Sequence, residues 1–516
     1  MKRNEQKPHI IIFNPDQWRG DVLGHMGNPA AKTPVLDEFI ATDAVSFRNA
    51  FCQNPVCTPS RCSFMTGWYP HVHGHRTMHH LLHYDRGESN LLKILKDNGY
   101  FVWWAGKNDL IYDDEDLRKY CDVRFKPTSE DFERWGYEGY PNPHVIQGLW
   151  RGSQSGDNYY SFYAGKLEPD HDIWFDGDWA RIYGALDLIR EYDDEKPLCM
   201  YLPLINPHPP YGVEEPWFSL TDRESLPQRV PVPGNEEGIR KDLWEGKPSI
   251  LKGIWERQGL DGWTEDRWTE LRATYYGMCS RLDHQFGLVL DALRDKKMYN
   301  DSSIFLFSDH GDFTGDYGLV EKTQNTFEDC LTRVPFIIKP PKNYNVKGHV
   351  NESLVELVDF SATVFELTEI DPEYTYFGKS LLPVMQKQLH SHRDAVFCEG
   401  GRMKGETHCM ERESFMELKP TGLYWPRVGL QATDEGDFHS KAIMCRTKRH
   451  KYVYRYYEQD ELYDLEADPN ELHNLVNDPS HLELLQSLKL RMLDWYVATC
   501  DVVPFKTDPR DFIPRK

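Results

Sequence analysis

Four short apolar runs recur along the chain, and each one is followed directly by polar residues. They are HIIIF (9–13), YFVWWA (100–105), LCMYLPLI (198–205) and SIFLFS (303–308). Apolar runs of this length, bounded by Gly, Pro and Asn, are typical of strands buried on both faces of a sheet. Pro203 weakens this interpretation for the third run, because proline cannot donate a hydrogen bond within a central strand ladder.

Helical patterns lie between these runs. SNLLKILKDNG (89–99) has leucines on one face and a glycine stop at Gly99, and 274–296 has a longer apolar periodicity. Strands that alternate with helices predict an α/β fold with a large, mostly parallel sheet flanked by helices. Ligands of such sheets bind beyond the carboxyl ends of the strands. All four runs are followed there by polar residues whose side chains can take part in catalysis, and this indicates an enzyme.

The pattern changes near residue 390. Residues 442–457 predict two strands around a basic turn, and 481–496 repeat apolar residues at helical spacing, at Leu482, Leu485, Leu488, Met492 and Trp495. We therefore predict a catalytic α/β domain over 1–389, with a long insertion at 212–270. A smaller C-terminal antiparallel α+β domain is predicted over 390–516.

Composition and charge narrow the classes of partner. The 516 residues carry a formal net charge of −22, from 82 acidic and 60 basic side chains. This charge disfavours a nucleic-acid or membrane partner, because both are anionic surfaces. No stretch approaches the length of a membrane span, and the N-terminal apolar run is too short for a signal peptide. Eleven irregularly spaced cysteines do not predict a disulfide framework. We expect a cytoplasmic protein, and the oligomeric state stays open, a homo-oligomer included.

The segment NPVCTPSRCSFMTG (54–67) carries the strongest chemical signal. Thr58 suits a helix N-cap, Pro59 the first helical position and Gly67 the C-terminal stop. Cys57 would then lie at a helix N-terminus, where free N–H groups favour an anion, and Arg61 adds a positive charge. Cys57 is then either a packed side chain or a thiolate nucleophile. The three residues between Cys57 and Arg61 disfavour a phosphatase loop, which has five.

A third interpretation rests on resemblance. Cys57-Thr58-Pro59-Ser60-Arg61, continued by Met65-Thr66-Gly67, resembles the signature of the type I sulfatases in the alkaline-phosphatase-like superfamily. The resemblance implies that fold, and implies that a maturation enzyme oxidises Cys57 to formylglycine. Hydrated formylglycine would attack the sulfur of a sulfate ester, release the alcohol and then expel inorganic sulfate. Cys62 has no such role, and we expect it to be packed.

The resemblance also implies one divalent cation. Asp16 and Gln17 would form its first pair of ligands, Asp309 and His310 its second, and position 57 would complete the site. Oxygen ligands suit a hard ion, Ca²⁺ first and Mg²⁺ next, and the nitrogen ligand admits Mn²⁺. Gln17 and His310 depart from the usual sulfatase residues and resemble those of phosphonate monoester hydrolases.

Further site residues carry over from the family pattern. Lys107, Lys322 and Arg61 would stabilise the sulfate oxygens, and His208 would protonate the leaving alcohol. The histidine usually found two residues after the first lysine is Asp109 here. His80 or its neighbour His79 is a candidate replacement.

The substrate beyond the sulfate is less defined by the sequence. Possible sugar or aryl platforms, most of them expected in the core, are Trp103, Trp104, Trp150, Trp217 and Tyr211. The glycine-rich segment GGRMKGETH (400–408) could reach the pocket from the C-terminal domain.

Three functions remain in competition. Hydrolysis of a small-molecule or saccharide sulfate ester is the first. Gln17 prompts the second, phosphonate monoester or phosphodiester hydrolysis, which Lys107 opposes because phosphonate hydrolases lack that lysine. Asp109 is the one support for the third, a catalytically inactive protein that binds sulfated ligands.

Overall fold

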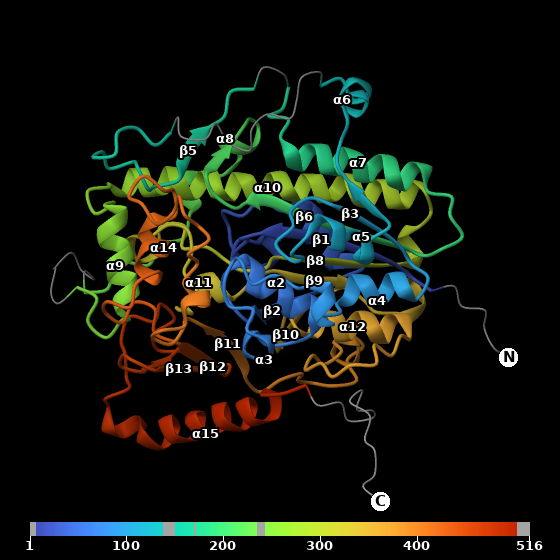
Figure 1. Ribbon diagram of the computed structural model, residues 1–516. Coiled ribbons are helices and arrows are strands. Elements are labelled where there is room, and N and C mark those ends of the chain that lie inside the picture. Colours follow the sequence, from blue (N-terminus) through green and yellow to red (C-terminus); the bar gives the residue numbers. More distant parts are fainter. Residues whose placement is uncertain (1–6, 138–149, 170–171, 235–242, 503–516) are drawn as a thin grey trace, which may run out of the picture.

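An eight-stranded sheet forms the centre of the structure, a computed structural model that describes residues 7–137, 150–169, 172–234 and 243–502 (Figure 1). Its strand order is β10-β2-β9-β8-β1-β6-β3-β4. β9 runs antiparallel to both of its neighbours, and the other pairs are parallel. The strands are β1 (His9–Asp16), β2 (Val45–Phe51), β3 (Phe101–Ala105), β4 (Val123–Phe125), β6 (Leu198–Pro207), β8 (Ser302–Phe307), β9 (Phe336–Lys339) and β10 (His349–Glu356). The predicted α/β class, with a large and mostly parallel sheet, is confirmed.

The four predicted strands are β1, β3, β6 and β8, and they are consecutive neighbours in this sheet. β6 continues through Pro203, which pairs with Asn14 at an irregular point of β1. The β3 partner has already stopped pairing at Tyr201, so the missing N–H of the proline leaves no ladder bond unmade. The carbonyl of Pro203 accepts a hydrogen bond from the backbone N–H of Lys107 at 2.9 Å. The proline therefore helps to fix the loop that carries a predicted site residue.

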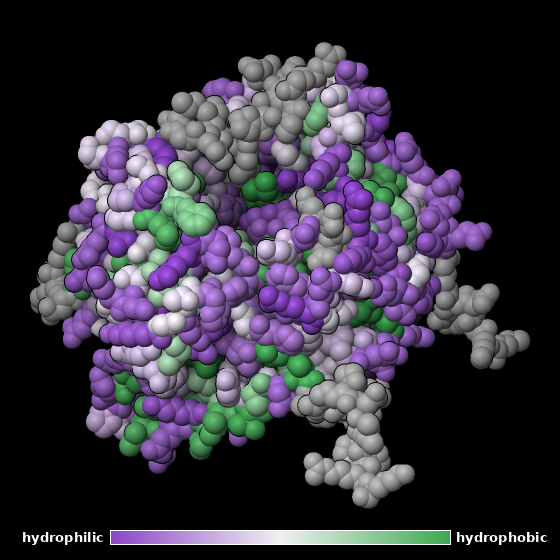
Figure 2. Space-filling view, in the orientation of Figure 1, coloured by the Kyte–Doolittle hydropathy of each residue, from purple (hydrophilic) through white to green (hydrophobic). Residues whose placement is uncertain are grey.

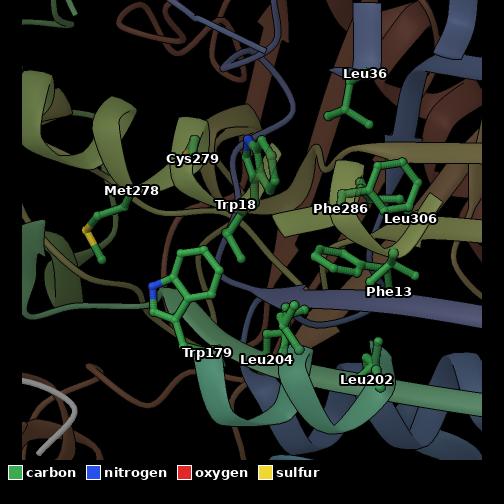
Figure 3. Close-up of a cluster of buried hydrophobic side chains, with 14 of the residues drawn as sticks. Phe13, Trp18, Leu36, Trp179, Leu202, Leu204, Met278, Cys279, Phe286 and Leu306 are labelled. Atoms are coloured by element: carbon green, nitrogen blue, oxygen red, sulfur yellow. The ribbon is translucent and has the colours of Figure 1, made fainter. Parts of the chain in front are cut away.

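Both faces of the sheet are covered by helices, as continuous apolar strands require. Ile11 and Phe13 point to a core under α1 (Pro34–Thr42), α7 (Gly177–Glu191) and α10 (Glu265–Asp295). Figure 3 shows Phe13 beside Phe286 of α10, whose ring centroids are 5.1 Å apart. Ile10 and Ile12 point to the opposite core, under α2 (Cys57–Thr66), α4 (Leu91–Asp97) and α12 (Asp359–Thr368). The alternation of neighbouring residues between two cores follows the two-residue period of a strand.

The predicted helices are present with changed bounds. α10 begins at Glu265, where Thr264 caps the N–H of Arg267, rather than at residue 274. Its first six residues, Glu265–Glu270, fall within the predicted insertion. The remaining helices are α3 (Pro70–His73), α5 (Asp114–Tyr120), α6 (Ser129–Trp135), α8 (Trp217–Leu220), α9 (Ser249–Gln258), α11 (Asp329–Thr332), α13 (Leu382–Met385), α14 (Trp425–Gln431) and α15 (Leu482–Thr499). Within the described ranges, no helix has both the length and the apolarity needed to cross a membrane.

A second, four-stranded antiparallel sheet follows near the C-terminus, with α15 packed on it (Figure 1). Its strands are β11 (Val396–Gly400), β12 (Ala442–Arg446), β13 (His450–Arg455) and β14 (Glu461–Asp464). Leu488, Met492 and Trp495 of α15 are buried as predicted, and Trp495 stacks on Phe397 with centroids 4.5 Å apart. Leu482, the first residue of the helix, is instead 54% exposed. The predicted antiparallel sheet is therefore present, while the division at 389/390 stays a prediction.

The second sheet is joined to the segment that precedes Cys57. The backbone N–H of Glu399 in β11 donates to the carbonyl of Gln53 at 2.9 Å, and the Asn54 amide donates to the Glu399 carbonyl at 2.7 Å. At Gly400 a Cβ atom would lie 1.6 Å from the carbonyl oxygen of Gln324, so only glycine permits this approach. The C-terminal region therefore contacts the segment that leads into the cysteine motif. A further two-stranded sheet pairs β5 (Tyr163–Lys166) with β7 (Tyr211–Val213).

Candidate active site

The carboxyl ends of the four central strands converge on Cys57. Asp16 ends β1, Lys107 follows β3, His208 follows β6 and Asp309 follows β8. Because these strands are parallel neighbours, their carboxyl ends meet at one edge of the sheet. Cys57 itself is not on a strand but in the first turn of helix α2. The convergence was expected from the sequence, whereas the distances within the site come only from the fold.

Helix α2 starts earlier than the sequence suggests. Its N-cap is Val56 and Cys57 is its first residue, so the prediction of Thr58 as N-cap was wrong. The Thr58 hydroxyl donates instead to the Met78 carbonyl at 3.1 Å, and it is therefore not available to cap the helix. The predicted stop at Gly67 is confirmed, since Gly67 has a φ of 74°. Cys62 is buried, as expected.

Cys57 is enclosed by charged and polar groups. Its Sγ lies 3.2 Å from His310 Nε2, 3.5 Å from Lys107 Nζ and 3.6 Å from Asp16 Oδ1. Burial, followed by the negative charge of Asp16, raises the pKa of the Cys57 thiol far above its ordinary value. The cysteine is therefore protonated at neutral pH in spite of the nearby lysine.

Asp16, Cys57, Asp309 and His310 form a group in which one ligand atom from each residue lies within 4.8 Å of the others. All four are fully buried. Nδ1 of His310 donates to the Gly311 carbonyl at 2.9 Å, which leaves Nε2 directed into the group. Burial lowers the pKa of His310, so the imidazole is neutral. Two carboxylates and a neutral imidazole nitrogen are suitable donors for a divalent cation.

Arg61 holds the two carboxylates of this group. Its side chain is 1% exposed, and it reaches Asp309 at 2.9 Å and Asp16 at 3.1 Å. Burial alone would raise the pKa of Asp16, but Lys107, His208 and Arg61 hold it well below its ordinary range. Arg61 also donates to Asn14 at 2.9 Å. It does not line the cavity, so the geometry shows it acting on the carboxylates.

Gln17 lies beside this group in a strained backbone conformation, with a φ of 71°. Its Oε1 accepts from Lys322 Nζ at 2.7 Å, and its Nε2 donates to Asp312. The Gln17 amide thus links Lys322 to Asp312, and the Gln17 backbone N–H donates to Asp309 of the predicted metal group at 3.1 Å. Its role as a metal ligand stays a prediction.

The two predicted substrate lysines both line the cavity above Cys57. Lys107 Nζ lies 2.7 Å from Asp16 and 2.8 Å from Asp109. Lys322 Nζ lies 2.7 Å from Glu321. Burial would lower the pKa of each lysine, but the surrounding negative groups have the larger effect. The pKa values of both lysines are therefore raised. Two fixed ammonium groups above one buried nucleophile position can bind a tetrahedral anion.

His208 also lines this cavity and is 9% exposed. Its Nδ1 donates to the Pro209 carbonyl at 2.6 Å, so Nε2 carries the free lone pair. Burial, and then Lys322, lower the pKa of His208 well below its ordinary value. The free imidazole is therefore neutral, and an anion between the lysines would offset their effect.

The two candidate helper histidines are placed differently. His79 lines the cavity, and its Nε2 contacts Ser414 Oγ at 2.8 Å. His80 is not among the lining residues, and its Nδ1 contacts the Gly74 carbonyl at 2.9 Å. Asp109 is linked to the site by its ion pair with Lys107. Its carboxylate lies where the family pattern has an imidazole, and it supplies a charge instead.

The cavity of about 760 Å³ has an outer wall that the sequence analysis largely missed. It comes from residues 411–428, including Tyr424 and Arg427, and from Trp150. Of the five suggested aromatic platforms, Trp150 lines this cavity, whereas Trp103, Trp104, Trp217 and Tyr211 are buried. The segment 400–408 does not reach it; Arg402 is buried and pairs with Asp434. The sequence of 411–427 is rich in aromatic and charged residues, which could have suggested a binding surface. It has no periodicity and no known motif that would have identified it as a cavity wall.

Comparisons with known proteins agree with this geometry. The family model described as "Sulfatase" matches residues 8–370, and the model described as "N-sulphoglucosamine sulphohydrolase, C-terminal" matches residues 435–497. An arylsulfatase of Clostridium perfringens is 26% identical, over 94% of this chain and 93% of its own length. A choline-sulfatase of Rhizobium meliloti is 27% identical, over 92% of this chain and 83% of its own length.

The fold is similarly shared with solved structures. A phosphonate monoester hydrolase of Agrobacterium radiobacter superposes with a TM-score of 0.73 at 20% identity, covering 99% of this chain and 100% of its own. The sulfatase match alone covers well over half of the chain, and it includes every predicted site residue. The chain belongs to the sulfatase family of sulfuric ester hydrolases.

Proposed function

We propose that the protein hydrolyses a sulfate ester of a small molecule or saccharide to an alcohol and inorganic sulfate. Position 57 would be the nucleophile after a maturation enzyme converts Cys57 to formylglycine. The observation that carries the proposal is the contact of Cys57 with Lys107 and with the buried Asp16–Asp309–His310 group. A nucleophile position, a cation site and an anion site therefore coincide.

The chemical state of the thiol supports the conversion. A thiolate is the reactive form of cysteine, and burial raises the pKa of Cys57 far above neutral pH. An unmodified Cys57 would therefore be a poor nucleophile. Formylglycine would supply a hydrated aldehyde, whose first hydroxyl attacks sulfur and whose second permits release of sulfate.

The donor set fits one divalent cation. Asp16, Asp309, His310 and the side chain at position 57 would hold it, with Gln17 as a further predicted ligand. Ca²⁺ is the first candidate, and Mg²⁺ and Mn²⁺ are alternatives. The cation would supply Lewis-acid activation of the nucleophile at neutral pH.

The protein's own residues then divide the remaining work. Lys107 and Lys322 bind the sulfate oxygens and stabilise the negative charge that develops on them. Arg61 holds Asp16 and Asp309 in place. His208 directs Nε2 toward the cavity, and the bound anion offsets the lysine charges that depress its pKa. It can then protonate the leaving oxygen.

The proposal is tested on protein produced together with a formylglycine-generating enzyme. Mass spectrometry of the peptide that contains Cys57 should show formylglycine, and the same protein should hydrolyse 4-nitrophenyl sulfate. Cys57→Ala protein should lack both properties. A protein with unmodified Cys57 and no turnover would instead support the inactive binder that Asp109 suggested.

Phosphonate monoester or phosphodiester hydrolysis is the second candidate. Gln17 and His310 resemble the metal pairs of phosphonate monoester hydrolases, and one of these enzymes shares the fold. Lys107 favours a sulfate ester over a phosphonate as the substrate, because phosphonate hydrolases lack that lysine. Rates on 4-nitrophenyl sulfate and on 4-nitrophenyl phenylphosphonate separate the two candidates, since a large preference for the phosphonate would contradict the first.

A further inference from the structure

A buried hydrogen-bond network contacts Lys322 at the inner end of the catalytic cavity. The inner end is lined by Cys57, Lys107, Lys322 and His208, and the outer end is lined by residues 411–428 together with Trp150. Figure 2 shows this face of the molecule hollowed beside the region of α14. Lys322 is only 3% exposed, so its position depends on the buried groups that surround it.

Tyr211 is the first member of this network. It is buried, and it begins β7, three residues after His208. Its hydroxyl donates to Asp312 at 2.8 Å and accepts from the backbone N–H of Glu321 at 3.0 Å. Glu321 directly precedes Lys322 in the chain. The Tyr211 hydroxyl therefore holds the backbone that carries the lysine.

Asp312 accepts hydrogen bonds from three residues. Its donors are Nε2 of Gln17, the Tyr211 hydroxyl, and both the backbone N–H and the hydroxyl of Thr314. The carboxylate is fully buried. An ionised carboxylate can only accept hydrogen bonds. The end of the Gln17 amide that faces Asp312 must therefore be its NH₂ group.

The Gln17 amide is thus held in one orientation. With Nε2 at Asp312, the amide oxygen faces Lys322 and accepts from its Nζ at 2.7 Å. An ammonium group can only donate hydrogen bonds. In the reversed orientation the oxygen would face the carboxylate and the NH₂ group would face the ammonium, so neither hydrogen bond could form. Asp312 and Lys322 therefore favour the same orientation of the amide.

The backbone of Gln17 is fixed as well. Its φ of 71° lies in a region that residues other than glycine rarely adopt. Its N–H donates to Asp309 at 3.1 Å, and its carbonyl accepts from the Tyr275 hydroxyl at 2.7 Å. These two contacts fix the point from which the amide extends toward the lysine.

The hydrogen bonds form a closed circuit. From the Tyr211 hydroxyl they run through Asp312 and Gln17 to the ammonium of the lysine. They return to the same hydroxyl through the backbone N–H of Glu321. Lys322 also forms an ion pair with Glu321 at 2.7 Å. Satisfied buried networks of this kind are rigid, so the ammonium is held in place before an anion binds.

We propose that Tyr211 and Asp312 are positioning residues for Lys322. They hold the Gln17 amide so that its oxygen fixes the ammonium at the inner end of the cavity. Neither residue is among those that line the cavity, so they act through the lysine and not on the substrate. A donor that is fixed in advance needs no reorganisation as negative charge develops. The proposal rests on the proposed sulfate-ester hydrolysis, in which Lys322 binds the sulfate oxygens.

A double-mutant cycle tests this role on the matured enzyme, with 4-nitrophenyl sulfate as the substrate and Ca²⁺ at saturation. Tyr211→Phe should lower kcat/KM about tenfold, the equivalent of one hydrogen bond to a charged group. In the Lys322→Met background the same change should lower it less than about twofold, because the residue that is positioned is gone. Tyr299→Phe is the matched control, since its hydroxyl also donates to an aspartate, Asp43, at 2.7 Å. It should behave as the wild type.

Asp312→Asn is an independent second variant. The new amide has the same shape but can donate as well as accept, so the Gln17 amide is no longer held in one orientation. We expect kcat/KM to fall about tenfold, and again by less than about twofold in the Lys322→Met background. Wild-type kinetics in either variant, or equal losses with and without Lys322, would overturn the proposal. Near-UV circular dichroism confirms folding, and if one variant does not fold the other decides.

Sulfate binding separates failure of this proposal from failure of the proposed function. Binding of inorganic sulfate to Cys57→Ala protein, measured by calorimetry with Ca²⁺ present, needs no turnover. Adding Tyr211→Phe should weaken it about tenfold, and adding Tyr299→Phe should leave it unchanged. If the wild type hydrolyses no sulfate ester, the proposed function fails, and this weakening still supports the positioning role. Unchanged sulfate affinity with Tyr211→Phe would overturn that role, whatever the enzyme hydrolyses.

Discussion

The two ends of the catalytic cavity are built in opposite ways. The inner end consists of buried charges at the ends of parallel strands, held by short ion pairs such as Lys107–Asp16 at 2.7 Å. The outer end is lined by residues 411–428, a mixture of polar, charged and apolar side chains that includes Tyr424 and the Arg427–Glu411 pair at 3.4 Å. In the proposed reaction the inner end would bind the sulfate group, and the outer end would contact the alcohol. The two ends are therefore built from different parts of the chain.

Removal of the cation should have the largest effect, because it would disable the inner end completely. After dialysis against a chelator we expect loss of sulfate-ester turnover and a lower thermal midpoint, both restored by Ca²⁺. A bound ligand at 100 times its Kd stabilises by about 2.7 kcal/mol. Asp309→Asn protein should show no Ca²⁺-dependent shift of its midpoint. Full activity in the chelated wild type would contradict the proposed metal.

Arg61→Met should be the most destabilising substitution at the inner end. It leaves Asp16 and Asp309 buried without their common partner, which costs about 3–5 kcal/mol. Arg449→Met, at an arginine whose side chain is 54% exposed and paired with Asp464, should cost about 0–1 kcal/mol. Urea unfolding of the chelated proteins measures both, and equal losses would show that Arg61 does not hold the carboxylates.

Lys322→Met should lower kcat/KM for 4-nitrophenyl sulfate about 10²–10³-fold, the usual effect of removing one donor from a developing anion. Steady-state kinetics at saturating metal measure this, with Lys252→Met, whose side chain is 53% exposed, as the control. An effect as small as that of the control would exclude Lys322 from contact with the sulfate.

Arg427→Met tests the connection between the two ends. Arg427 lies 3.6 Å from Glu321, which pairs with Lys322. Its loss should lower kcat/KM about tenfold, the equivalent of one hydrogen bond to a charged group, and Arg427→Lys should restore part of it. If kcat/KM stays at the wild-type value, the outer helix α14 does not support the substrate lysine.

Asp109→Asn should have the smallest effect at neutral pH. Burial lowers the pKa of Lys107, but Asp109 and Asp16 outweigh it and keep the lysine protonated to high pH. Without Asp109 the pKa of Lys107 falls, so the basic limb of the kcat/KM profile should move to lower pH. A profile between pH 7 and pH 11 measures the shift, and an unchanged basic limb would contradict this role.

The inner end was largely predictable from sequence, because local patterns determine it. A buried strand followed by polar residues predicts both the strand and the edge at which its last residues lie. This pattern placed Asp16, Lys107, His208 and Asp309 at that edge, and the resemblance to sulfatases assigned their roles. The start of α2 was not, because the Thr58 hydroxyl has a partner at Met78 that is distant in sequence.

Only the tertiary structure decided the outer end. Nothing near Tyr424 in the sequence marks it as part of a pocket. It nevertheless lies beside His208, with ring centroids 6.3 Å apart. The sequence by itself determined the strands, the cysteine motif and the family resemblance, since each depends on residues close together in the chain. Which side chains face the leaving group depends on packing between segments more than 200 residues apart, and that packing has no local signature.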